Sequence, residues 1–238
     1  MRDIFKVMRF DYLTAKPIAF VVFLFCVVLF GLLGMFISPM ICSYILFSAM
    51  LFVIPLQGIA DKSGFNKMYG ILPVNRKNIT RARFLYIFLV HFLTELLETV
   101  IILFAMEFKL YRLLPNQDSE MIQLSAPTFS KYYEVLGLTV AMFSFFCLLF
   151  VYMEMMGQLF GRENEMKIIL ISLGVITVLA VLFFVLSDKG VIPVLPVPEM
   201  PESTSGRITV GIVLNIVMFG ISVIFGEITA GKLAKREL

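Results

Sequence analysis

Long apolar runs separated by short polar breaks dominate the pattern along the chain. A bilayer core about 30 Å thick requires roughly 20 apolar residues per helix, and six runs have about that length. The runs cover residues 17–37, 40–59, 84–106, 135–160, 168–187 and 208–226. The pattern predicts an all-α polytopic membrane protein with six transmembrane helices in a single domain, residues 1–238, because little chain remains for a second folded unit.

The composition supports this class and excludes others. Hydrophobic residues make up 60% of the chain and charged residues 16%, and the mean hydropathy is +0.94. A soluble domain contains about 25% charged residues, so a soluble enzyme is excluded. The net charge of +3 is spread over many loops, which argues against a nucleic-acid partner. Cys26, Cys42 and Cys147 all fall inside apolar runs and are expected to be buried thiols without a disulfide or metal role.

The basic residues predict the orientation. Fifteen of the 20 Lys and Arg residues lie in the N-terminal segment, the connection 60–83, the turn 161–167 and the C-terminus. With six spans these four segments share one side, and the positive-inside rule makes that side cytoplasmic. We expect a multi-pass protein of the cell membrane with both termini in the cytoplasm, and connections 107–134 and 188–207 on the outer side.

Residues 1–16 are predicted to form an amphipathic helix on the inner membrane surface, followed by a turn at Lys16-Pro17 into the first span. One helical arc carries apolar side chains and the opposite side carries Arg2, Lys6 and Arg9. The apolar positions are Ile4, Phe5, Val7, Met8 and Tyr12. Alternatively, the segment is only a basic tail that orients the protein.

The cytoplasmic connection 60–83 contains a second amphipathic pattern. Phe65, Met68, Tyr69 and Leu72 follow the i, i+3, i+4, i+7 spacing of one helical face, and Pro73 ends the pattern. A loop this short cannot bury such a stripe by itself. The stripe must therefore contact either the membrane surface or a groove on a soluble partner.

The segment Asp61-Lys-Ser-Gly-Phe-Asn-Lys-Met-Tyr-Gly-Ile-Leu-Pro-Val-Asn-Arg-Lys-Asn-Ile79, between spans two and three, resembles the permease subunits of type-two ABC exporters. The Leu-Pro-Val-Asn-Arg turn is similar to that of the compact six-span bacterial branch, which includes peptide and lantibiotic-type exporters. The resemblance implies that residues 62–72 are a coupling helix that docks on a separate P-loop ATPase, and that residues 2–16 are the connecting helix. It also implies a second permease subunit, identical or different, with ATP and Mg bound by the ATPase and no cofactor in this chain.

The third span contains the ionisable residues His91, Glu95 and Glu98, which share one helical face. Glu95 lies about halfway across, where a lipid-facing carboxylate is disfavoured by roughly 2.5 kcal/mol or more. The stripe should therefore face protein or water. It is either an interhelical polar contact or a lining of the translocation pathway; metal chemistry is disfavoured because His91 is the single histidine of the chain.

Two further acidic residues and one incomplete P-loop motif remain as candidate functional features. Glu154 and Glu227 lie near the inner ends of their spans, where solvent, Arg162 or Lys232 are the expected partners. The stretch Gly226 to Leu233 has the spacing of a P-loop but ends in Leu instead of Ser or Thr. No catalytic residue is therefore assigned, and the chain is not expected to be an enzyme.

These patterns together favour the permease half of an ATP-driven exporter that moves an amphipathic peptide or lipid-like cargo outward. The alternative is a stand-alone six-span carrier or immunity protein that uses the polar stripe of span three as a proton relay.

Overall fold

The computed structural model describes residues 2–37, 39–62, 75–108, 110, 129–189 and 204–236. The elements within them are helical, so the predicted all-α class is confirmed for the described part of the chain. The elements are α1 (Arg2–Phe36), the 3-10 helix η1 (Pro39–Tyr44), α2 (Ile45–Lys62), α4 (Arg76–Glu107), α6 (Phe129–Phe160), α7 (Arg162–Asp188) and α8 (Thr204–Arg236).

Five of these helices contain stretches long and apolar enough to cross a membrane. The stretches are Ala19–Phe36, Lys77–Ala105, Thr139–Phe160, Lys167–Ser187 and Ile208–Leu233. They coincide with five of the six predicted spans. In the predicted span 40–59, η1 precedes α2 and the apolar helical stretch, Ile41–Ile54, is shorter than the other five. The chain is thus a multi-pass membrane protein with five clear candidate spans.

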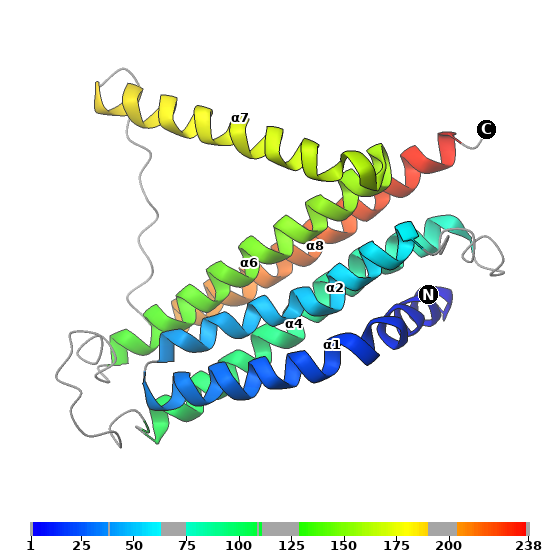
Figure 1. The fold of residues 1–238 in the computed structure, drawn as a ribbon. Coiled ribbons are helices and arrows are strands. Elements are labelled where there is room, and N and C mark those ends of the chain that lie inside the picture. Colours follow the sequence, from blue (N-terminus) through cyan, green and yellow to red (C-terminus); the bar gives the residue numbers. More distant parts are fainter. Residues whose placement is uncertain are drawn as a thin grey trace.

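Helix α4 lies at the centre of the bundle (Figure 1). It packs against α1, α2, α6 and α8, whereas α7 packs mainly against α6 and diverges from the other helices. Both described ends of the chain, the start of α4 and the α6–α7 turn lie at one end of the bundle (Figure 1). The four basic segments of the sequence therefore begin or end on the same side, as the charge count predicts.

Aromatic side chains from several helices fill the core beside α4. Phe84 from α4 and Phe143, Phe146 and Phe150 from α6 are buried with Leu46 from α2. Lipid tails are as apolar as these side chains, so helix association in a bilayer depends on close van der Waals packing and polar contacts. The rings of Phe88 and Phe143, which meet edge-on at 6.1 Å, provide such a contact between α4 and α6.

No helix end occurs at Lys16-Pro17, because α1 is one helix of 35 residues with Pro17 inside it. Its N-terminal part is set at an angle to the remainder (Figure 1). Of the predicted apolar arc, Phe5 is 65% exposed and Tyr12 38%, whereas Ile4 and Met8 pack beside the buried Val7. The side chains that face the protein include Val7, which packs on α4, and Asp11, which is fully buried.

Two glycines shape the connections. Gly161 separates α6 from α7 and adopts a positive φ of 86°, a conformation that L-amino acids with a Cβ rarely adopt. Gly34 in α1 lies directly against Cys42 of η1, and a Cβ there would collide with the cysteine Sγ. The absence of a side chain at Gly34 therefore lets η1 approach α1 closely.

Candidate functional site

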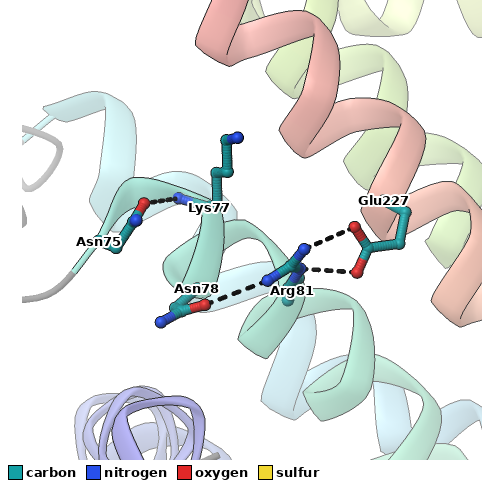
Figure 2. A network of polar contacts seen from close by, with 5 residues as sticks. All are labelled: Asn75, Lys77, Asn78, Arg81 and Glu227. Atoms are coloured by element: carbon teal, nitrogen blue, oxygen red, sulfur yellow. Dashed lines mark hydrogen bonds and ion pairs between the residues drawn. The ribbon is translucent and has the colours of Figure 1, made fainter.

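The polar residues of α4 begin at its first turn. The Asn75 side-chain Oδ1 accepts a hydrogen bond from the Lys77 backbone N–H at 3.0 Å, and the Asn75 carbonyl accepts from Asn78 N–H at 2.8 Å (Figure 2). Asn75 therefore caps the helix as an N-cap residue does. Asn78 and Thr80 lie in the first turns that follow.

One turn further along α4, Arg81 forms a bidentate ion pair with Glu227 of α8 (Figure 2). Arg81 Nε lies 2.6 Å from Glu227 Oε1, and Nη2 donates to Oε2 at 2.7 Å. The two side chains are 37% and 51% exposed. Solvent screens such a pair, so its value lies in fixing the orientation of α4 against α8 more than in stability.

Arg83 forms a second ion pair, with Glu154 of α6, and this one is buried. Arg83 Nη1 lies 3.4 Å from Glu154 Oε1, and the two side chains are 9% and 3% exposed. Gln158 also donates to Glu154 Oε1, at 2.5 Å. Two arginines of α4 thus pair with Glu154 and Glu227 and tie the start of this helix to α6 and α8.

His91 lies deeper in α4 and is completely buried. Its Nδ1–H donates to the Ile87 carbonyl at 2.8 Å, and its ring lies 5.3 Å from that of Phe150. No group of three metal-ligating side chains occurs among the described residues. The histidine is therefore part of the interface between α4 and α6.

Glu95 and Glu98 are also buried, and each binds a different neighbouring helix. Glu95 Oε1 accepts from Asn215 Nδ2 of α8 at 3.2 Å, and Glu98 Oε1 accepts from the Thr139 hydroxyl of α6 at 2.9 Å. The buried hydroxyl of Ser43 lies near Glu98 but outside hydrogen-bonding geometry. The predicted polar face of α4 thus points towards protein, and its contacts are interhelical.

A cavity of about 550 Å³ lies between α4, α6 and α8. Its lining is almost entirely apolar, with Glu95, Asn215 and Thr99 as the polar side chains. Of the predicted stripe, only Glu95 reaches this cavity; His91 and Glu98 do not line it. Asn215 was not predicted, although it is the single amide side chain in the apolar run 208–226 and that isolation was its available signal.

The predicted ATPase-docking residues, Phe65, Met68, Tyr69 and Leu72, lie outside the described residues, as do most of the outer connections 107–134 and 188–207. The described part of the chain places the two flanks of the docking segment, the end of α2 and the capped start of α4, at one end of the bundle (Figure 1).

Comparison with known proteins gives no relatives: the chain matches no protein-family model, no curated protein and no solved structure.

Proposed function

We propose that this chain is the membrane-spanning subunit of an exporter driven by a separate P-loop ATPase, working with a second permease subunit. The observation that carries this proposal is the position of α4. This helix leaves the predicted docking segment at one end and carries the buried carboxylate of the cavity, Glu95, near its middle.

The two ion pairs connect these regions mechanically. Arg81 joins the first turns of α4 to Glu227 of α8, and Arg83 joins them to Glu154 of α6. The same three helices enclose the cavity. A push on the segment before α4 would therefore be transmitted first to the helices that line the cavity, which is the coupling that an ATP-driven change between two packings requires.

The alternative, a stand-alone carrier, needs a proton relay along the polar stripe. In the described structure His91, Glu95 and Glu98 form no hydrogen bond to one another; their bonds go to a backbone carbonyl, to Asn215 and to Thr139. This arrangement supports a packing and binding role for the stripe and gives the carrier no continuous path.

The docking claim is tested by co-purification. The tagged chain is expressed in its native cells, the co-purifying P-loop ATPase is measured, and Phe65→Asp and Tyr69→Asp are compared with the unaltered chain. A charged side chain in the apolar stripe should remove most of the recovered ATPase, because a buried unpaired carboxylate disfavours the contact.

Phe108→Asp is the matched control. It makes the same substitution at a 62% exposed phenylalanine at the opposite end of α4, so recovery of the ATPase should not change. Full recovery with the Phe65 and Tyr69 variants would refute docking through this segment.

A further inference from the structure

The cavity between α4, α6 and α8 has the size and the lining of a small-molecule site. Such sites have volumes of about 300–1,000 Å³, apolar walls and a few placed polar groups. The cavity measures about 550 Å³ and is partly open to the outside of the bundle.

Two hydrogen-bond acceptors at this cavity have no partner. Glu95 is 4% exposed, and its Oε2 makes no hydrogen bond. Asn215 uses its amide nitrogen for Glu95 and for the Gly211 carbonyl, which leaves its buried Oδ1 without a donor. Buried acceptors are normally satisfied, so an unsatisfied oxygen on each of these two hydrogen-bonded side chains, both of which line the cavity, points to a missing donor there.

A cationic group would supply both the missing N–H donors and a counter-charge for Glu95. An ionised carboxylate deep in an apolar bundle is strongly disfavoured without a counter-charge, and the basic side chains Arg81 and Arg83 are paired with other acids near the end of α4. Aromatic rings add to the preference for a cation: Phe88 and Phe92 stack at 5.7 Å, and Phe219 meets Phe88 edge-on at 5.3 Å. All three line the cavity, and aromatic faces attract cations.

We propose that this cavity binds an organic cation with an apolar body, whose ammonium group donates to Glu95 Oε2 and Asn215 Oδ1 while the body occupies the apolar remainder. A lipid chain alone would fill the volume but leave both oxygens unsatisfied. The site rests on the proposed function only in that its ligand would be the exported cargo; binding itself is a property of this chain and requires no ATPase.

The chain contains no tryptophan, which permits a direct binding assay. Phe219→Trp places a single indole at the cavity wall, and the protein is reconstituted in nanodiscs. The probe is a primary alkylamine with a nitroxide on its chain, which quenches the indole on contact. An alkanol with the same chain and nitroxide, compared at the same mole fraction in the bilayer, measures quenching by unspecific partitioning.

We expect saturable quenching by the amine at concentrations about tenfold or more below those needed for the alkanol. Glu95→Gln should remove this difference, whereas Glu98→Gln should retain it. The second variant is the matched control, because Glu98 is an equally buried carboxyl one turn away that does not line the cavity.

A second variant leaves the Glu95 carboxylate in place, so that the proposal can still be tested if Glu95→Gln does not fold. Ala141 lines the cavity from α6 and is exposed, so Ala141→Phe should fill the space and weaken amine binding to the level of the alkanol. Equal quenching by amine and alkanol in the unaltered cavity, or undiminished amine binding in Glu95→Gln, would overturn the proposal. The co-purification test has no bearing on either result, so failure of docking and failure of binding are distinguishable.

Discussion

The two arginine pairs of α4 offer a direct test of how burial sets the strength of an ion pair. Arg81 and Arg83 are two residues apart on one helix, and each contacts a glutamate on another helix. The geometry favours Arg81, which makes two short contacts at 2.6 and 2.7 Å against one at 3.4 Å for Arg83. Burial favours Arg83 instead, because the Arg83–Glu154 pair is almost completely buried whereas the Arg81–Glu227 pair is partly exposed. We therefore compare Arg81→Met with Arg83→Met.

The magnitudes separate the two variants clearly. Removing one partner of a buried pair costs about 3–5 kcal/mol, because the other charge stays buried without compensation. Removing one partner of an exposed pair costs about 1 kcal/mol or less. Since Glu154 is 2% exposed and keeps the hydrogen bond from Gln158, Arg83→Met belongs to the lower end of the first case. With roughly 2–4 °C of Tm per kcal/mol for a chain of this length, the variant should lower Tm by roughly 6 °C or more, and Arg81→Met by about 4 °C at most.

The assay is thermal unfolding of purified protein in one detergent, followed by the loss of a monodisperse peak in size-exclusion chromatography. A double variant, Arg83→Met with Glu154→Met, removes both charges and should recover most of the loss, because apolar replacement of a whole buried pair is often close to neutral. Equal losses for Arg81→Met and Arg83→Met, or no recovery in the double variant, would refute the claim that burial decides the effect.

Three further substitutions follow from local geometry. Gly161→Ala should destabilise the chain by about 1–2 kcal/mol, because an alanine at φ 86° is strained. Gly34→Ala should lower Tm and be partly rescued by Cys42→Ala, because the new Cβ would collide with the cysteine sulfur. Thr139→Val should cost about 1–3 kcal/mol, because Glu98 Oε1 loses its buried hydroxyl donor.

Each of these variants is compared with a matched control variant in the same unfolding assay. Gly174→Ala serves both glycine variants: nothing lies within 4 Å of its added Cβ and its φ is not positive, so it should be neutral or slightly stabilising. Ser144→Ala serves Thr139→Val, because Ser144 donates to a carbonyl of its own helix. A control that loses as much stability as its partner would contradict the stated cause.

The spans were predictable because their signal is local. Length and hydropathy alone locate five stretches that the structure shows as helices. Helix partners were not predictable, because they depend on which helices become neighbours. Glu154 and Glu227 have Arg162 and Lys232 close in sequence, yet the structure pairs them with arginines more than 70 residues away.

The continuity of α1 shows a different limit. A proline inside a helix removes one backbone hydrogen bond, which favours a break in an isolated segment. In the folded chain, Val7 packs against Ile79 and Ala82, and Ala15 and Ala19 pack beside α2 and α4. These contacts hold both sides of Pro17 in place, so tertiary packing overrides the local preference.

The sequence was sufficient to predict the acidic residues of the candidate site. It was not sufficient to predict the residues that contact them. The cost of a lipid-facing carboxylate indicated that Glu95 faces protein, and it is buried. The same argument cannot distinguish a residue that lines a cavity from one that fills a helix contact. That difference between Glu95 and Glu98 arises from α8, which approaches α4 at Asn215 and leaves space beside it.

The isolation of α7 makes bilayer thickness a variable for this protein. Its apolar stretch is 6% buried, against 39% for that of α6, so the other described helices of the chain leave most of it uncovered. Its apolar stretch of 21 residues spans about 31 Å, which matches a hydrocarbon core of about 30 Å, and tilting is the usual accommodation when the bilayer becomes thinner. Because few protein contacts oppose that tilt, a thinner or thicker membrane should reorient α7 about the hinge at Gly161 before it disturbs the helices around α4.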